Sequence, residues 1–408
     1  MQFFRFAAIL LSALIASASS HPDWDGIRNQ IDGILHIPSP LPALEAKRYG
    51  KLSPASGIEA ERVSYATAYQ LRVPAIIYHA AGATITKHPA LIIVNGHGGD
   101  KSSWYSYWSG IVYARAGAVV LTYDPIGEFE RNKERRSNTR QHDQIVEPQE
   151  EMGRRLGGLM ITDVMQAVTY LAKRPDVDPK RIAVLGYSMG SFVSALTCAV
   201  DTDIDACVIT GGGNLDGPGE HWDTASARVC EQIPYRALNP LGDRGATLYA
   251  LSAKRGPELV FNGSSDTVVD IAHEGQSFFE DLRRRTVAQA GSAKDVFQFE
   301  FSAGTGHAPY FVTKPVALWL EEKLKFPNWK RKQIEAMLET RVGDWANSNH
   351  VTVSAGESPI LALGADVPAV SRADLHSIPE AVWEAEQDSY IYETWRESAL
   401  TASRSDAR

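Results

Sequence analysis

The sequence is poor in cysteine, with 3 among 408 residues. Cys198 and Cys207 fall in apolar stretches and Cys230 in a polar one, so at most one disulfide can form and one thiol is left over. We interpret the first two as small buried hydrophobic residues. CxxC and HExxH patterns are absent from the chain, and we therefore expect no metal ion and no structural zinc site.

An excess of positive charge is also missing. The chain carries 41 Lys and Arg against 49 Asp and Glu, a formal net charge of -8. Nucleic-acid binding depends on clustered basic side chains that displace counterions from phosphates, so this composition excludes a nucleic-acid partner. The one dense basic run, 131–140, is interleaved with acids and amides, and we interpret it as a solvated loop.

Long hydrophobic runs are absent except near the N-terminus. There Arg5 precedes the apolar run FAAILLSALIA (6–16), and Ala16-Ser17-Ala18 is a small-residue cleavage motif. The pattern predicts a signal peptide over 1–18. The run is about half as long as the roughly 20 residues that a membrane-spanning helix needs, so we expect a secreted or periplasmic protein with no stable membrane anchor.

Short apolar strands and amphipathic helices alternate over residues 65–326. This alternation is typical of a mostly parallel, doubly wound α/β sheet with helices on both faces. The expected strands are ALIIVNG (90–96), AVVLTYD (118–124), RIAVLG (181–186), DACVIT (205–210), PELVFNG (257–263) and VFQFEFS (296–302). The expected helices cover 102–117, 159–171, 189–200, 272–285 and 314–325.

Other regions of the chain interrupt this alternation or lie outside it. Residues 211–255 are rich in Gly, Asp and Pro and too long for a plain loop, so we expect a lid-like insertion over the carboxyl edge of the sheet. Residues 19–64 form an N-terminal segment and 327–408 a C-terminal extension. The total length suits one large catalytic domain, 65–326, with these additions.

Ser188 lies in the pentapeptide Gly186-Tyr187-Ser188-Met189-Gly190, which matches G-x-S-x-G between an expected strand and an expected helix. Such a sharp turn needs small flanking residues and lifts the serine hydroxyl into the open. The helix that follows directs its N-terminal amides toward the same place. The position therefore predicts a nucleophile rather than an ordinary capping serine.

A serine nucleophile needs a base and an acid to orient it. His307 directly follows the last expected strand, and Asp266 follows the strand before it, in the chain order Ser, Asp, His that this architecture requires. We predict that His307 is the base and Asp266 its orienting carboxylate. Asp270 is the alternative acid. The remaining candidates, Asp216, Glu220, His221 and His273, do not follow the expected strands.

The glycine-rich turn NGHGG (95–99) follows the first strand of the series, where such a sheet supplies one oxyanion-hole amide while Met189 supplies the other. We predict that Gly98 or Gly99 is the donor, with His97 as the alternative. As a metal ligand, His97 has no partner at ligand spacing in the sequence.

The stretch YDPIGEFER (123–131) also follows an expected strand. Glu128 and Arg131 are therefore candidate substrate contacts, as are His97 and Tyr187 beside the predicted turn and nucleophile. The alternative for Glu128 and Arg131 is a surface pair with no role in binding.

The residues 95–99, the elbow at 186–190, Asp266 and His307 resemble the α/β-hydrolase superfamily over 65–326. NGHGG and YDPIGEFER more specifically resemble secreted bacterial acetyl xylan esterase-like proteins, which are akin to dienelactone hydrolases and to prolyl oligopeptidase catalytic domains. The resemblance implies an α/β-hydrolase sheet, in which we place the insertion 211–255 after the sixth strand. It also implies attack by serine on an ester, an acyl-enzyme released by water, and no cofactor.

The sequence thus predicts a secreted serine carboxylesterase for small acyl esters, with acetyl esters of polysaccharides as candidate substrates. A prolyl oligopeptidase-type peptidase is one alternative, although too few residues precede the first strand for a β-propeller. A uronic acid methyl esterase is another, and it would need a basic contact such as Arg131. A non-catalytic binding protein with the hydrolase fold is the last alternative. It would lack one of the catalytic residues, whereas this sequence has candidates for all three, Ser188, Asp266 and His307.

Overall fold

The computed structural model describes residues 22–82, 87–225, 230–291 and 296–406. The predicted signal peptide, 1–18, lies outside the described residues. Among the helices of the described ranges, none is both long enough and apolar enough to span a membrane.

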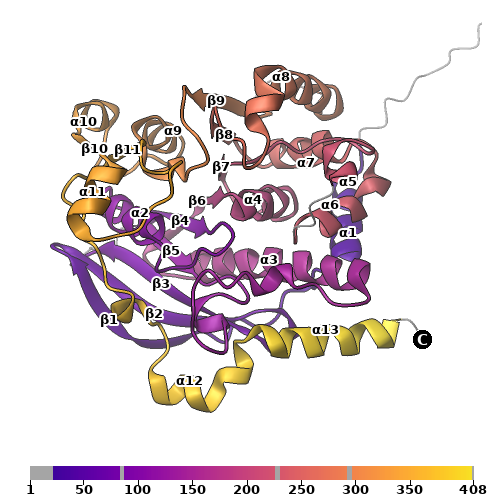
Figure 1. Cartoon of the computed structure of the whole chain (residues 1–408), viewed down its shortest axis with the longest axis horizontal. Coiled ribbons are helices and arrows are strands. Elements are labelled where there is room, and N and C mark those ends of the chain that lie inside the picture. Colours follow the sequence, from indigo (N-terminus) through magenta and orange to yellow (C-terminus); the bar gives the residue numbers. More distant parts are fainter. Residues whose placement is uncertain (1–21, 83–86, 226–229, 292–295, 407–408) are drawn as a thin grey trace, which may run out of the picture.

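A nine-stranded sheet runs through the molecule (Figure 1). Its strands are β1 (Lys47–Ala55), β2 (Ile58–Ala66), β3 (Arg72–Ala80), β4 (His88–Val94), β5 (Val119–Tyr123), β6 (Val177–Tyr187), β7 (Ala206–Thr210), β8 (Glu258–Gly263) and β9 (Gln298–Ser302). They lie in the order β1-β2-β3-β5-β4-β6-β7-β8-β9. Pairing is parallel from β5 to β9 and antiparallel among β1, β2, β3 and β5.

The predicted mostly parallel, doubly wound sheet is confirmed, because helices cover both of its faces. Along β4, Ile92 and Val94 enter one apolar core while Leu91 and Ile93 enter the other, as the alternation of side chains in a strand requires. The first core is covered by α1 (Trp24–Leu35), α3 (Gln149–Ala172), α4 (Met189–Val200), α7 (Arg244–Ala253) and α8 (Ile271–Ala290). The second is covered by α2 (Trp104–Arg115) and α9 (Lys314–Leu324).

The N-terminal segment belongs to the same sheet, which differs from the predicted boundary at residue 65. β2 crosses that boundary and pairs with β1 on one side and β3 on the other. β1 has no buried residue and a polar sequence, so it carries no apolar run that could have marked it as a strand. Pairing with β2 makes it the edge of the sheet.

The insertion follows β7, which is the seventh strand of the described chain and not the expected sixth. It holds α5 (His221–Thr224), α6 (Gln232–Ala237) and α7. α7 packs against α4 and α8 and so covers the sheet, whereas α5 and α6 lie over its carboxyl edge. Arg244 at the start of α7 is fully buried and binds the carboxylates of Asp216 and Asp223, both at 2.8 Å.

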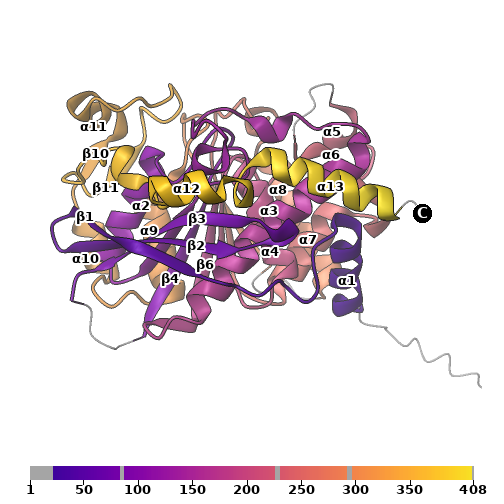
Figure 2. The same cartoon turned by 90° about the horizontal axis from the view of Figure 1, so that it is seen from below.

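The C-terminal extension wraps around the sheet (Figure 2). It contains α10 (Arg331–Ala336), β10 (Glu339–Arg341), α11 (Val342–Asn349), β11 (Leu361–Leu363), α12 (Glu380–Glu386) and α13 (Tyr392–Asp406). In α11 the Trp345 ring packs 4.5 Å from that of Trp108 on α2. At the other end α13 packs along α3, and the Tyr392 hydroxyl donates to the Gln144 carbonyl at 2.7 Å. The extension is thus packed onto the sheet and its helices.

Candidate active site

The turn between β6 and α4 holds Ser188 in a strained conformation, with φ 55° and ψ −121°. A Cβ at Gly186 would lie 2.2 Å from the Gly190 carbonyl oxygen, and a Cβ at Gly190 would lie 2.2 Å from the Val94 carbonyl oxygen. Neither position can therefore hold a larger residue without a shift of the backbone. This is the steric requirement that the pentapeptide implied, and strain of this kind is concentrated at functional sites.

His307 and Asp266 meet beyond the ends of β9 and β8. The His307 Nδ1 lies 2.7 Å from the Asp266 Oδ2. Asp266 is fully buried, and its Oδ1 accepts a hydrogen bond from the Val268 amide at 2.9 Å. This pairing places the proton of a neutral imidazole on Nδ1 and leaves Nε2 free to accept one. The alternative acid, Asp270, instead lies 3.4 Å from the solvent-exposed His273.

A cavity of about 540 Å³ joins the predicted nucleophile to the predicted base. Gly211, after β7, has φ +62°, and a Cβ there would lie 2.9 Å from Cε1 of His307, so the chain passes directly beside the imidazole. The described residues that line the cavity are His97, Arg140, Tyr187, Ser188, Met189, Ser191, Phe192, Gly212, Gly213, Asn214, Leu215, His221, Trp222, Ala225, Glu231, Gln232, Thr267, Val268, Val269, Asp270 and His307.

The apolar part of the cavity wall was not predicted in detail. Phe192 in the first turn of α4 stacks on Trp222 of the insertion, with ring centroids 5.7 Å apart. Leu215 and Val269 extend this apolar surface. The composition of the insertion indicated a wall over the sheet edge, but only the fold shows which of its side chains face the serine.

The loop after β4 lies against the serine. A Cβ at Gly96 would lie 2.9 Å from the Ser188 Cβ. The Gly99 amide donates to the Gly96 carbonyl at 3.0 Å and is therefore committed to the turn, which argues against Gly99 as an oxyanion donor. Gly98 is held by Asn138, whose amide donates to the Gly98 carbonyl at 3.1 Å, and of the loop residues in the described chain only His97 lines the cavity.

Met189 meets the requirement for the other donor. Met189 is the first residue of α4, so its backbone amide has no acceptor inside the helix. Met189 also lines the cavity, next to Ser188 in the chain. Met189 on α4 and His97 on the loop after β4 therefore line the same cavity as Ser188.

The predicted substrate contacts Glu128 and Arg131 are buried and do not line the cavity. Arg131 is fully buried, forms an ion pair with Asp163 and donates to the Asp124 carbonyl at 3.3 Å. Glu128 is also fully buried and accepts hydrogen bonds from the amides of Thr139 and Arg140 at 3.0 and 2.7 Å. Both side chains turn into the protein and hold the loop after β5. The Asp163 carboxylate compensates for the burial of Arg131, and the two backbone amides compensate for the burial of Glu128.

A buried lysine on the loop after β4, which the sequence did not mark, contacts the loop after β5. Lys101 is fully buried and contacts Asp124 and Glu130, the latter at 2.7 Å. Glu130 in turn accepts from the amides of Ser377 and Ile378 of the C-terminal extension, at 2.7 and 3.0 Å. The extension therefore stabilises the loop that carries Arg140 to the cavity.

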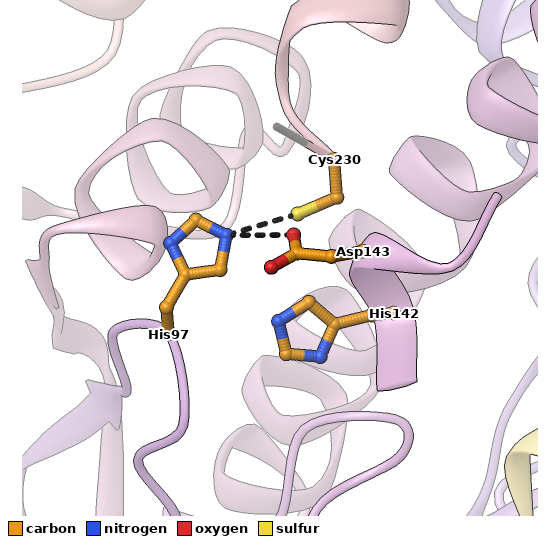
Figure 3. A group of neighbouring side chains, drawn as sticks. All are labelled: His97, His142, Asp143 and Cys230. Carbon is orange, nitrogen blue, oxygen red and sulfur yellow. Dashed lines mark hydrogen bonds and ion pairs between the residues drawn. The ribbon is translucent and has the colours of Figure 1, made fainter. Parts of the chain in front are cut away.

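His97 lies in a cluster of polar side chains that includes His142, Asp143 and Cys230 (Figure 3). Its Nε2 is 3.2 Å from Asp143 Oδ1, 3.3 Å from Cys230 Sγ and 3.3 Å from Glu231 Oε2. Burial disfavours the charged imidazole, but the two carboxylates outweigh this and raise the pKa of His97 to about 10. In the sequence, His97 has no neighbour at the spacing expected of metal ligands. In the fold, segments distant in the chain bring such neighbours to it.

All three cysteines are buried and carry free thiols. Cys198 on α4 and Cys207 on β7 belong to the apolar core, in agreement with their interpretation as packing residues. Cys230 differs because its thiol donates to the Glu231 carboxylate at 3.2 Å.

Comparison with known proteins supports the superfamily that the motifs resemble. The prolyl oligopeptidase family matches residues 148–332. The YtaP protein of Bacillus subtilis is 41% identical over 56 residues, which are 14% of this chain and 19% of that protein. A polyketide transferase of Stachybotrys chlorohalonatus is 31% identical over 120 residues, 26% of this chain and 40% of that protein. The chain thus spans less than half the length of these curated relatives.

Solved structures share the fold over a larger part of the chain. A methylesterase, 18% identical, covers 94% of this chain and 76% of its own with a TM-score of 0.58. An acetyl xylan esterase from Paenibacillus, 15% identical, covers 75% of this chain and 96% of its own with a TM-score of 0.51. At these identities the likeness establishes the fold, and the site must be argued from its own residues.

Proposed function

The chain has the α/β-hydrolase fold, and on this premise we propose that it is a serine carboxylesterase with Ser188 as nucleophile, His307 as base and Asp266 as the orienting acid. The observation that carries the proposal is the shared cavity. The strained serine and the imidazole line the same space, and the imidazole is held by a buried carboxylate at 2.7 Å. The shared cavity of Ser188 and His307, the chain order of the three residues and the orientation of the imidazole by Asp266 all suit acyl transfer.

In the proposed reaction, His307 Nε2 takes the proton of the Ser188 hydroxyl as its oxygen attacks the ester carbonyl. The amides of Met189 and His97 receive the oxyanion of the tetrahedral intermediate. The imidazolium then protonates the leaving alcohol, and an acyl-enzyme forms. Water, activated by the same imidazole, attacks this acyl group and restores the serine. Every proton taken up by His307 is returned, and no cofactor takes part.

The cavity favours an ester with a small acyl group. Its volume of about 540 Å³ must hold both the acyl and the alcohol part of the ester, and the side chains of Phe192, Trp222 and Leu215 form an apolar part of its wall. Acetyl esters of polysaccharides remain our favoured substrates. The solved acetyl xylan esterase with the same fold is consistent with this choice.

A methyl ester of a uronic acid is the second candidate, and Arg140 is the observation in its favour. The sequence suggested Arg131 as the basic contact that such a substrate needs, but that residue is buried away from the cavity. Arg140 lines the cavity with about half of its side chain exposed. A neighbouring uronate of the same polysaccharide could pair with it. Secretion, which either polysaccharide substrate requires, rests on the predicted signal peptide alone.

The test is a substrate panel applied to wild type and to Ser188→Ala. The panel contains p-nitrophenyl acetate, a longer acyl ester, acetylated xylan, methyl-esterified pectin and a prolyl peptide. Ser194→Ala is the matched control, because Ser194 is buried on the same helix and does not line the cavity. We expect turnover of acetyl esters by wild type and by the control, and none by Ser188→Ala.

Failure of the wild type to hydrolyse any ester, or equal turnover by Ser188→Ala, would refute the mechanism. Cleavage of the prolyl peptide in preference to esters would assign the protein to the peptidases. Preference for the pectin would select the methylesterase, and Arg140→Ala should then raise KM for pectin while leaving p-nitrophenyl acetate unaffected.

A further inference from the structure

The polar cluster around His97 brings together side chains from three separate segments. His97 lies in the loop after β4, His142 and Asp143 lie in a short helix (Gln141–Asp143), and Cys230 lies just before α6. Each of the four offers one nitrogen, oxygen or sulfur atom, and these atoms all lie within 4.8 Å of one another. Figure 3 shows the side chains converging on a common space.

In His142 and Asp143 the other polar atom of the side chain already has a partner, which leaves the atom that faces the cluster for a cation. His142 is fully buried, and its Nδ1 lies 3.2 Å from the Ile126 carbonyl, to which it donates in the neutral tautomer. Its Nε2 is buried and accepts no hydrogen bond from the described residues, and in Figure 3 a ring nitrogen faces His97 and Asp143. Asp143 is similarly oriented, since Arg140 binds its Oδ2 at 2.7 Å and leaves Oδ1 for the cluster.

The spacing matches a tetrahedral zinc site. With bonds of about 2.05 Å to nitrogen or oxygen and about 2.3 Å to sulfur, tetrahedral ligands lie about 3.4 Å apart, or about 3.6 Å when one is sulfur. His97 Nε2 lies 3.2 Å from Asp143 Oδ1 and 3.3 Å from Cys230 Sγ. The remaining pairs of ligand atoms lie within 4.8 Å of each other. Two imidazoles, a thiolate and a carboxylate are also the donors that Zn²⁺ prefers over Mg²⁺ or Ca²⁺.

We propose that His97, His142, Asp143 and Cys230 form a structural Zn²⁺ site with four protein ligands. Binding forms bonds from Zn²⁺ to His97 Nε2, His142 Nε2, Asp143 Oδ1 and Cys230 Sγ. The Cys230 thiol and the protonated His97 ring each release one proton to solvent. Glu231, whose carboxylate accepts from the Cys230 thiol at 3.2 Å, remains beside the site as a further negative charge.

The site would act on the proposed catalytic cavity through its ligands. His97 and Glu231 line that cavity together with Ser188, so the ion would bind the proposed oxyanion loop to the insertion and to the loop after β5. Zinc therefore fixes the mouth of the cavity and does not touch the ester. Without it, His97 would remain paired with Asp143 and Glu231 as a protonated imidazole.

The test measures zinc on the full mature chain. Protein treated with a chelator and then loaded with Zn²⁺ should retain one equivalent through gel filtration, by elemental analysis, and should melt at a higher temperature. Cobalt, loaded in place of zinc, should produce a thiolate-to-metal charge-transfer band and the intense visible bands of tetrahedral Co²⁺. The cobalt spectrum of the wild type needs no variant, so it stays informative if a substitution impairs folding.

Two matched pairs of variants locate the site. Cys230→Ala should abolish the charge-transfer band and weaken zinc binding at least about tenfold, whereas Cys198→Ala, at a buried thiol elsewhere, should preserve both. His142→Gln should weaken binding likewise. His36→Gln should leave it intact, although His36 lies in another group of possible ligands with Glu151 and Asp406.

The proposal is overturned if the wild type retains no stoichiometric zinc, if its cobalt complex lacks the thiolate band, or if Cys230→Ala binds as tightly as Cys198→Ala. If His36→Gln loses zinc and Cys230→Ala and His142→Gln retain it, the ion binds at His36, Glu151 and Asp406 instead. These results are independent of catalysis, because Ser188→Ala should bind zinc like the wild type whether or not the protein is an esterase.

Discussion

Glu258 should make the stability of this protein fall as the pH rises. It is the first residue of β8 and is fully buried, and neither of its carboxylate oxygens accepts a hydrogen bond from the described residues. Burial raises the pKa of Glu258 from 4.5 to about 7, against the moderating effects of Ser252, Arg255 and Cys207 nearby. The folded protein therefore binds this proton more tightly than the unfolded chain does.

The sign and the size of the effect follow from linkage. Because the pKa is raised on folding, the stabilising contribution is fully present below pH 4.5 and is lost as the pH rises through about 7. At 1.36 kcal/mol per pKa unit, the loss between the two limits is about 3 kcal/mol. Glu258→Gln keeps the shape of the side chain and removes the charge, so the variant should be more stable than the wild type above pH 7.

Urea unfolding from about pH 5 to about pH 9 measures this difference. The free energy of unfolding of Glu258→Gln, minus that of the wild type, should increase across this range by about 3 kcal/mol, since other titrating groups cancel in the subtraction. Glu300→Gln, an exposed position on the neighbouring strand β9, is the matched control and should follow the wild type. Parallel curves for the wild type and Glu258→Gln would refute the reasoning.

Three further substitutions test the roles of single residues. Asp266→Asn should lower kcat by about 10⁴-fold with the circular dichroism spectrum unchanged, because the amide no longer favours the proton on His307 Nδ1; a loss below tenfold would contradict the triad. Gly356→Ala places a Cβ 2.4 Å from the His307 carbonyl oxygen, so kcat should fall while the protein stays folded, and full activity would show that this contact does not position the base. Arg131→Ala should destabilise the protein by about 3–5 kcal/mol in urea unfolding, because it leaves the buried Asp163 unpaired, with KM little changed; a raised KM at unchanged stability would restore its role in substrate binding.

The parallel strands and the nucleophile turn could be predicted because their signals are local. A buried parallel strand is a continuous apolar run, as in residues 90–94, and the elbow needs its glycines within a single pentapeptide. The strand β1 could not be found in this way. It is an edge strand without a buried residue, so its pairing with β2 leaves no apolar pattern in the sequence.

Charged residues were the main source of error. Arg131 and Glu128 follow a strand at the carboxyl edge, where substrate contacts are common, yet both are buried. The direction of these side chains depends on Asp163, which lies on α3, and on the amides of 139 and 140, which lie further along the same loop. Arg140, only nine positions further along the loop, is the arginine that lines the cavity.

The amino-acid sequence by itself determined the sheet type, the strained turn at Ser188 and the order of the proposed triad. Each of these depends on neighbouring residues or on the order of the strands along the chain. Only the tertiary structure decided which side chains meet. His97 and Cys230 are far apart in the chain but lie 3.3 Å apart in the fold, as the loop after β4 and the insertion meet over the same sheet edge. Contacts of this kind arise from the packing of whole elements, and no local pattern of residues encodes them.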